Sequence, residues 1–257
     1  MPIHPTAVVE PGAQVDPSCL VGPFAYVGPH VVMGPGCRLH PYGMVTGHTV
    51  MGARNQVFSH AVVGEIPQDL KYGGEPTRTV SGDDNVFREC TTVHAGTVQD
   101  RGETRIGNRC LFMATSHVAH DCVIGDRAII ANGVGLAGHV VLEEDIHFGG
   151  LSGAHQFVKV GRLAFVGGMC GVVMDVAPYT IVNGTRAEVV GLNKIGMQRA
   201  GMTEEQVARV ELAFKIFFRS KLQAAEALAR LEAELGAFPE VAHFTAFVKG
   251  SKRGVTR

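Results

Sequence analysis

The sequence lacks an excess of charge of either sign and lacks a long hydrophobic run. Its 257 residues carry 23 Lys and Arg against 24 Asp and Glu, so the net charge gives no reason to expect nucleic acid or an anionic membrane as a partner. No segment approaches the length of a membrane span, and the N-terminus has no basic region ahead of an apolar stretch. We therefore expect a cytoplasmic globular protein with no transmembrane segment and no nucleic-acid partner.

An apolar residue recurs at every sixth position through most of the chain. The series runs in one phase over residues 3–63, returns in that phase over 81–93, and continues one residue out of phase over 106–172. The fifth position of each hexad is usually small or β-branched, and the third is often Pro. A period of six fits neither an α-helix nor a simple alternating strand. It fits a short strand followed by a corner, with three such sides forming one coil.

These coils predict a mainly β fold, a left-handed parallel β-helix over residues 1–191. The left hand is taken from the resemblance of the pattern to hexapeptide-repeat proteins, since general crossover chirality would predict the opposite hand. A polar stretch near residues 65–78 interrupts the repeat without changing its phase. We expect a loop inserted into one coil there, and such loops commonly carry functional residues. A second interruption, around residues 96–104, shifts the phase by one residue.

The repeat gives way to a helical pattern after about residue 192. Thr203 and Gln206 have the spacing of a capping box, and apolar residues at helical spacing follow them. Further helices are expected over 223–235 and 239–249. We predict a small C-terminal α-helical domain over residues 192–257. Its basic residues fit ordinary surface solvation, with an acidic partner as the alternative.

The six cysteines fit packing better than disulfide formation. Five of them occupy the inward fifth position of a hexad, where a small apolar side chain is needed. They are Cys19, Cys37, Cys110, Cys122 and Cys170. Only Cys90 falls outside this position, so we expect five buried, reduced thiols.

Three histidines interrupt the otherwise bland outer surface of the repeat. Residues three hexads apart stack on one another, so His120, Gly138 and Gln156 form one column and His139 lies one coil from His120. His117 heads a neighbouring column, which continues with Gly135, Gly153 and Gly171. The stacked glycines predict a trough beside the histidines that is not filled by side chains and could hold a long apolar ligand.

His120 is the candidate general base. An imidazole with a pKa of about 6.5 can accept a proton from a hydroxyl or amine nucleophile at neutral pH, and Asp121 is placed to orient it. Gly138 offers a backbone N–H to a developing oxyanion. No Ser or Cys nucleophile lies in the same columns, which favours direct transfer. The structural alternative is that a corner histidine only binds backbone groups.

Metal binding is the rival chemistry for these histidines. Hexapeptide-repeat proteins of the gamma carbonic anhydrase class hold zinc with histidines, and neutral imidazole is a common zinc ligand. The spacing from His117 to His120 is shorter than the spacing expected in that class. We therefore predict no metal.

Several motifs together resemble the UDP-N-acetylglucosamine O-acyltransferases, the family that begins lipid A biosynthesis. The motifs are Gln68-Asp-Leu-Lys-Tyr-x-Gly-Glu-Pro76, His117-x-x-His-Asp121, Leu136-Ala-Gly-His139 and His155-Gln156. The resemblance covers essentially the whole chain. It implies a homotrimer with active sites in clefts between subunits, transfer of a 3-hydroxyacyl chain from acyl carrier protein to the glucosamine 3-hydroxyl of the UDP-sugar, and no cofactor.

The resemblance also implies residue roles, carried over motif by motif. His120 becomes the general base, Asp121 its orienting partner and Gly138 the oxyanion donor. Contacts to the sugar, its diphosphate or the pantetheine arm fall to Asp69, Lys71, His117, His139, His155, Gln156, Asn193 and Arg199. Gly168 becomes the position whose side-chain size sets acyl length, and glycine there leaves room for a longer chain.

Three positions depart from the family pattern, namely Ala95, Ile195 and Ala200. Arginine is expected at 95 and 200 and an acidic residue at 195, so the nucleotide contacts stay open. A 3-amino UDP-sugar acceptor, which would give an amide, is one alternative. The related N-acyltransferase carries a domain ahead of its β-helix, and small-sugar acetyltransferases lack the loop near 65–78. A non-enzymatic β-helix would not be expected to show clustered histidines.

Overall fold

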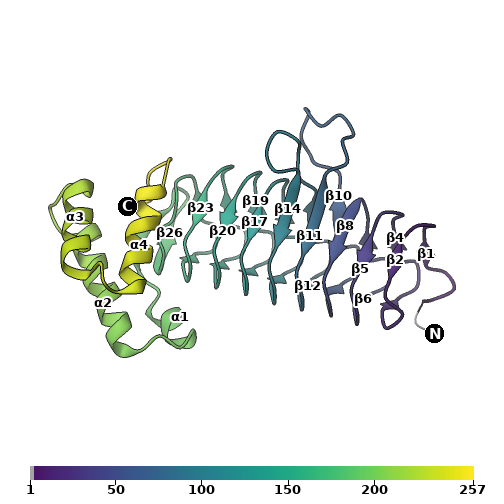
Figure 1. The fold of residues 1–257 in the computed structure, drawn as a ribbon, viewed down its shortest axis with the longest axis horizontal. Helices are drawn as coiled ribbons and strands as arrows, with labels where there is room; N and C mark the ends of the chain where they lie inside the picture. The colour runs from purple at the N-terminus through teal and green to yellow at the C-terminus, as the bar shows by residue number, and fades with distance from the viewer. Residues whose placement is uncertain (1–2) are drawn as a thin grey trace.

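A computed structural model describes residues 3–257, and its larger part is a regular prism of stacked coils (Figure 1). Three sheets of short strands form the faces of this prism. The first sheet contains β1 (Val8–Val9), β4 (Tyr26–Val27), β7 (Met44–Val45), β10 (Val62–Glu65), β13 (Thr92–His94), β16 (His117–Val118), β19 (Gly135–Leu136), β22 (Gly153–Ala154) and β25 (Gly171–Val172). The second contains β2 (Gln14–Val15), β5 (Val32–Met33), β8 (His48–Met51), β11 (Arg78–Ser81), β14 (Glu103–Ile106), β17 (Val123–Ile124), β20 (Val141–Leu142) and β23 (Lys159–Val160).

The third sheet contains β3 (Leu20–Val21), β6 (Arg38–Leu39), β9 (Gln56–Val57), β12 (Val86–Phe87), β15 (Leu111–Phe112), β18 (Ile129–Ile130), β21 (His147–Phe148), β24 (Phe165–Val166), β26 (Thr180–Asn183) and β27 (Glu188–Leu192). Successive strands belong to successive sheets, and almost every pairing is parallel with a neighbour one coil away. The exception is the antiparallel pair β26–β27, which ends the stack. The predicted left-handed parallel β-helix is confirmed.

The corners between the strands are tight turns that suit the recurring prolines. At one corner Pro23 is followed by Phe24 in the left-handed region, with φ of 57°, and Ala25 N donates to Gly22 O across 3.3 Å. This is the pattern of a type II turn, in which Pro presets the first central residue and the second takes a positive φ. Asp121 and His139 occupy the same turn position on neighbouring coils.

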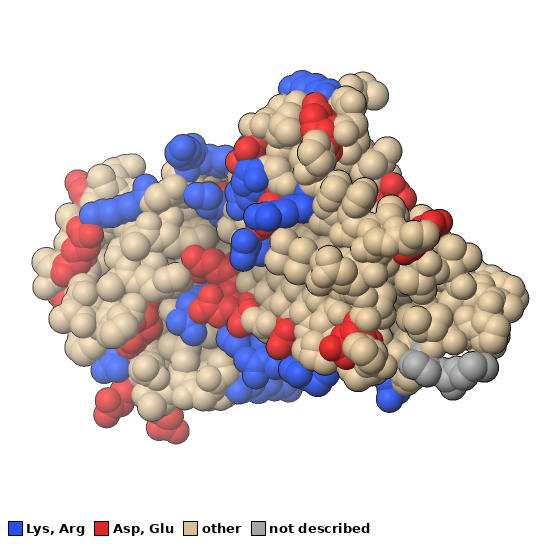
Figure 2. Space-filling model, turned by 45° about the vertical axis from the view of Figure 1, so that its right-hand side comes forward, with Lys and Arg blue, Asp and Glu red and all other residues tan. Residues whose placement is uncertain are grey.

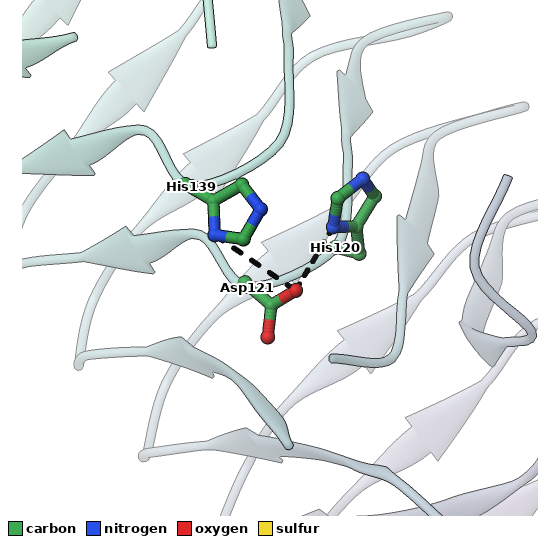
Figure 3. A group of neighbouring side chains, drawn as sticks. All are labelled: His120, Asp121 and His139. Atoms are coloured by element: carbon green, nitrogen blue, oxygen red, sulfur yellow. Dashed lines mark hydrogen bonds and ion pairs between the residues drawn. The ribbon is translucent and has the colours of Figure 1, made fainter. Parts of the chain in front are cut away.

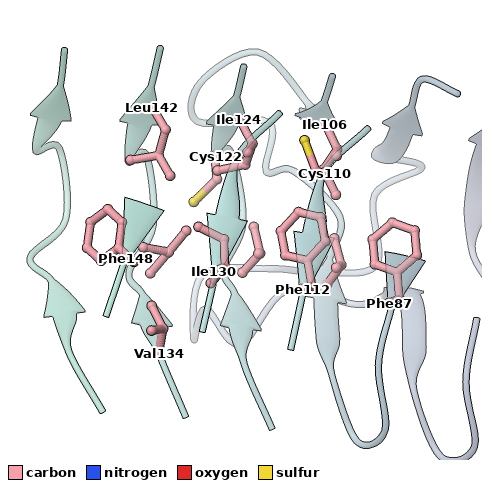
Figure 4. Packing of buried hydrophobic residues seen from close by; sticks show 14 of the residues in the cluster. Phe87, Ile106, Cys110, Phe112, Cys122, Ile124, Ile130, Val134, Leu142 and Phe148 are labelled. Carbon is pink, nitrogen blue, oxygen red and sulfur yellow. The ribbon is translucent and has the colours of Figure 1, made fainter. Parts of the chain in front are cut away.

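The interior of the prism is a continuous apolar core of first- and fifth-position side chains (Figure 4). Phe87 and Phe112 stack one coil apart, with ring centroids separated by 5.1 Å. Burial of each such side chain contributes about 1.5–3 kcal/mol, which makes the repeat the main source of stability. The five cysteines predicted to be packed are buried, and Cys90 is exposed.

The C-terminal part contains α1 (Lys194–Arg199), α2 (Glu204–Phe214), a π-helical turn η1 (Lys215–Arg219), α3 (Ala224–Leu235) and α4 (Pro239–Gly250). The three predicted helices are confirmed, whereas α1 was not predicted. The Thr203–Gln206 capping box is present at the start of α2. After α4 the chain returns to the prism, where Val255 bridges to Asp175. Among the described residues, no helix combines the length and hydrophobicity of a membrane span.

Candidate active site

The stacking of β16, β19 and β22 brings the histidine region together. His117 pairs with Gly135, and Gly135 pairs with Gly153, so the predicted column is confirmed. The corner that follows these strands carries His120 on one coil, with Gly138 above it on the next. The repeat therefore positions residues that are far apart in sequence on one edge of the prism, between the first and second sheets.

His120 and Asp121 form a close imidazole–carboxylate pair (Figure 3). His120 Nδ1 lies 2.9 Å from Asp121 Oδ2, and the Asp121 side chain is fully buried. Thr97 also donates to this carboxylate from its backbone N at 2.9 Å and from Oγ1 at 2.6 Å. Because a carboxylate oxygen accepts, His120 Nδ1 is the donor and Nε2 is left to face outward.

The ring of His120 lies directly against Gly138 on the next coil. A Cβ atom at Gly138 would lie 2.5 Å from His120 Cε1 and 2.7 Å from Nε2. Only glycine leaves room for the imidazole at this approach. The Gly138 N–H has no hydrogen-bond partner among residues 3–257, so it can donate to a group bound beside His120.

His139 occupies the turn position above Asp121 and completes the cluster. Its ring meets the His120 ring edge to face at 5.0 Å and stacks on Phe157 at 4.3 Å. Its Nδ1 lies 2.9 Å from Asp100 Oδ2 and 4.0 Å from Asp121 Oδ2. Each imidazole therefore has its inner nitrogen beside a carboxylate, which fixes the direction of its outer nitrogen.

His120, Asp121 and His139 each place one donor atom within 4.8 Å of the others, a spacing that a metal ion would fit. The Nδ1 atoms of the two histidines, however, already lie at hydrogen-bond distance from carboxylates, His120 from Asp121 and His139 from Asp100. Binding an ion between them would require breaking these hydrogen bonds. That the site uses no metal stays a prediction.

His117 and His94 form a second pair of neighbouring imidazoles, in which His94 is buried and His117 is half-buried. His117 Nδ1 lies 2.7 Å from Thr92 Oγ1, and the His94 ring meets it edge to face at 4.9 Å. The pKa of His94 is lowered to about 4, chiefly by burial and to a smaller extent by the charge of the nearby His117. The pKa of His117 is lowered as well, chiefly by burial and to a smaller extent by the charge of His120. The repeat did not predict that His94 lies beside His117. The second interruption lengthens this coil, so Thr92 pairs with His117, 25 residues later, outside the regular spacing of three hexads.

A shallow groove opens beside the histidines. It is lined by Gln68, His117, Ala119, His120, Gly135, Leu136, Ala137 and Gly138. A Cβ at Gly135 would meet nothing within 4 Å, and one at Gly153 would meet only Gly135 O at 3.4 Å. At Gly171 a Cβ would lie 2.6 Å from Thr185 O. The prediction of an open trough over all three glycines was therefore wrong at its last position, which the chain after β26 covers.

The inserted loop between β10 and β11 brings Gln68 to this groove. Asp69 in the same loop uses Oδ1 to accept from Lys71 N at 2.9 Å, and Lys71 is exposed. His155 and Gln156 are exposed on the coil above Gly138, where the His155 Nδ1 lies 3.0 Å from Gln156 O. Of these residues, only Gln68 lines the groove together with His120, and none of them forms a hydrogen bond with the His120 side chain.

The remaining predicted residues lie on another face of the same chain. Asn193 and Arg199 line a pocket over the third sheet, together with Ile195 and Ala200. Asn193 also caps α1, since its Oδ1 accepts from Gly196 N at 2.9 Å.

Neither Gly168 nor Ala95 lines the histidine groove or the pocket over the third sheet. Gly168 lies at the corner after the third sheet, where an added Cβ would meet only Gly150 O at 3.4 Å. Ala95 is buried and donates from its N to Glu65 O at 2.8 Å. The histidine groove and the pocket over the third sheet share no lining residue, so one subunit keeps these two groups of predicted residues apart.

The fold and the imidazole–carboxylate site define a hexapeptide-repeat transferase. Residues 103–138 match the bacterial transferase hexapeptide family, and residues 175–256 match domain 2 of UDP N-acetylglucosamine O-acyltransferase. A curated relative from a species of Anaeromyxobacter is 62% identical over the whole of both chains, and one from Myxococcus xanthus is 49% identical over 99% of each. Both carry the name acyl-[acyl-carrier-protein]–UDP-N-acetylglucosamine O-acyltransferase.

Solved structures agree with these sequence relatives. The UDP-N-acetylglucosamine O-acyltransferase of Moraxella catarrhalis superimposes with a TM-score of 0.96 at 40% identity, covering 100% of both chains. The Arabidopsis UDP-N-acetylglucosamine acyltransferase gives 0.87 at 36% identity, covering 99% of this chain and 100% of that one. The chain belongs to the UDP-N-acetylglucosamine O-acyltransferase family.

Proposed function

We propose that the protein transfers a (3-hydroxy)acyl chain from acyl carrier protein to the 3-hydroxyl of UDP-N-acetylglucosamine. Membership of the family supports this reaction, since the relatives that match over essentially their whole length are named acyl-[acyl-carrier-protein]–UDP-N-acetylglucosamine O-acyltransferase. The observation that supports the mechanism is the His120–Asp121 pair, held against Gly138 at the edge of an open groove. Attack of a sugar hydroxyl on an acyl thioester needs such a base, because the hydroxyl is a weak nucleophile until its proton is removed.

In the proposed mechanism His120 acts through its outer nitrogen. Nε2 removes the proton of the sugar hydroxyl while the hydroxyl oxygen bonds to the thioester carbonyl carbon. The Gly138 N–H donates to the oxyanion that forms, and the Asp121 carboxylate stabilises the imidazolium. The carbon–sulfur bond then breaks, and His120 returns its proton to the leaving thiolate. The step uses no cofactor, and acyl carrier protein and the UDP-sugar are both substrates.

The proposed active unit is a homotrimer acting in the cytoplasm. A site shared between neighbouring subunits would bring the His120 corner of one chain to the Asn193–Arg199 pocket and Gly168 of another, which a single chain keeps apart. Figure 2 shows Lys and Arg side chains gathered between the projecting loops and the helical end. Arg101 and Lys159 line a groove beside α4, which suits a carrier protein and its pantetheine phosphate.

The test offers the purified protein UDP-N-acetylglucosamine or its 3-amino analogue, each with a panel of acyl carrier proteins, and identifies products by mass. We expect an ester on the N-acetylglucosamine sugar. The His120→Ala variant should lose transfer while keeping the wild-type melting temperature and oligomeric state. Amide formation as the preferred reaction, or full turnover by His120→Ala, would contradict the proposal.

Gly168 provides a test of acyl selection. The open space around its Cα admits a larger side chain without backbone collision. Gly168→Met should therefore fold normally and shift the preferred donor to a shorter acyl chain, because the side chain fills the end of the proposed acyl site. Competition between carrier proteins with acyl chains of different length measures the shift. An unchanged preference would remove Gly168 from the acyl site.

A further inference from the structure

The second interruption of the repeat, residues 95–102 between β13 and β14, lies against both imidazole–carboxylate contacts of the site. Thr97 donates to Asp121, and Asp100 lies beside His139. The segment is held in shape by its own backbone, because Asp100 N and Gly102 N both donate to Thr97 O, at 3.3 and 3.0 Å. Asp100 is therefore delivered to His139 by a short, closed turn.

Asp100 decides which carboxylate His139 uses. The inner nitrogen of His139 is 2.9 Å from Asp100 Oδ2 but 4.0 Å from Asp121 Oδ2, the oxygen that His120 already engages at 2.9 Å. Without Asp100, two imidazoles would compete for one buried oxygen. With it, each imidazole has its own acceptor.

The charge on Asp100 favours the same arrangement. The hydrogen bond with His139 is the largest cause that lowers the pKa of the Asp100 carboxyl below its ordinary value, with Arg101 at 3.5 Å adding to the effect. The carboxylate is thus ionised at neutral pH and can only accept. His139 Nδ1 must then carry the hydrogen, and Nε2 points away from both carboxylates.

We infer that Asp100 is a positioning residue that holds His139 in one tautomer and orientation and keeps Asp121 free for His120. The site then consists of two imidazole–carboxylate pairs, His120–Asp121 for proton transfer and His139–Asp100 for presenting Nε2 to the sugar acceptor. This inference rests on the proposed function for the role of His139, but its geometry can be tested without turnover.

The direct test is the tautomer of His139, read from imidazole ¹⁵N shifts at a pH where the ring is neutral. Wild type should show the hydrogen on Nδ1. Asp100→Ala should lose that preference, while Asp100→Asn, which keeps an acceptor oxygen, should retain much of it. Gln99→Ala, at the exposed neighbouring position, is the matched control and should match wild type. An unchanged tautomer in Asp100→Ala would overturn the inference.

The kinetic test is a double-mutant cycle between positions 100 and 139. Loss of the group that orients a metal-bound histidine typically costs about tenfold to a hundredfold in metal affinity or activity. By analogy, we expect Asp100→Ala to lower kcat/KM by about tenfold, the low end of that range. In a His139→Ala background the same change should have no further effect, because the interaction is already gone. Full additivity of the two losses would overturn the positioning role. Absence of acyl transfer by wild type would instead refute the proposed function, leaving the tautomer result to judge this inference.

Discussion

At the scale of single residues, glycines 138 and 135 are required for different reasons. The first leaves space for a protein ring, and the second leaves space for a ligand. A methyl group at 138 would overlap the His120 imidazole, whereas the same group at 135 would point into open space. Sequence periodicity placed both glycines in their columns, but it could not show that the His120 ring folds back over one of them, because rotamers are not encoded in a repeat.

Gly138→Ala should therefore damage catalysis more than stability. The new Cβ displaces the His120 ring from its place beside Asp121, and a displacement of about 1 Å can cost a hundredfold in rate. We expect kcat to fall by about that factor while the protein stays folded. Gly135→Ala serves as the stability control and should melt at the wild-type temperature. A fully active Gly138→Ala variant would show that the ring does not need this position.

The buried His94 should make stability depend on pH. Its pKa is about 4 in the folded protein and about 6.5 when unfolded, so between these values the unfolded chain binds more protons. Stability should fall as pH drops from about 6.5 towards 4, by about 3 kcal/mol in total from this group. His94→Gln should flatten that part of a pH series of urea unfolding curves. His4→Gln, at an exposed position, is the control. Equal slopes in wild type and His94→Gln would refute the assignment.

At the scale of elements, one corner of the prism departs from the apolar rule. The fifth-position column at the corner between the second and third sheets contains Cys37, then Asn55 and Asn85, then Cys110. Asn85 is fully buried, accepts from Cys110 N at 2.8 Å and donates to Gly107 O at 2.9 Å. These amides satisfy backbone groups at the two coils around the first inserted loop, so they preserve the register where the chain departs and returns.

Asn85→Ala should destabilise the β-helix more than a change of similar size in the same column. It leaves the buried Cys110 N–H and the half-buried Gly107 carbonyl without that partner, and an unsatisfied buried group costs about 1–3 kcal/mol. Cys110→Ala removes only one packed sulfur and should cost about 1 kcal/mol. Thermal melting of the two variants compares them. Equal losses would mean that the amide hydrogen bonds contribute little.

The elements that sequence predicted best are those with a period. The six-residue repeat fixed the strands, and helical spacing located the later helices. Helix α1 was missed because six residues with an internal glycine show no amphipathic period, and Asn193 was its only start signal. Asp100 was missed as well, since 39 residues separate it from His139 and it lies where the repeat is interrupted. Residues on insertions need the fold before their partners can be identified.

At the scale of the whole molecule, the separation of the histidine corner from the Asn193–Arg199 pocket predicts complementation between inactive variants. If neighbouring subunits share each site, His120→Ala and Arg199→Ala subunits mixed, unfolded and reassembled together will form some sites with both residues intact. Random reassembly of equal amounts in a cyclic trimer restores about a quarter of the sites. Activity assays of the mixture against each variant alone measure this. No recovery from correctly assembled mixed trimers would place all required groups in one subunit.

The backbone of Thr185 lies over Gly171 and closes one end of the trough, which would limit the direction of an acyl chain bound there. The uncovered part of the trough spans only the coils of Gly135 and Gly153, a length of about 10 Å at the spacing of stacked strands. An extended acyl tail that is longer than this distance cannot continue parallel to the axis of the prism. In the proposed trimer it would bend away sideways, toward the Gly168 edge of the neighbouring subunit. The blocked end of the trough would thus give the lipid a bent path in the proposed trimer, with its carboxyl end at the His120 corner of one subunit and its methyl end at the Gly168 edge of the next.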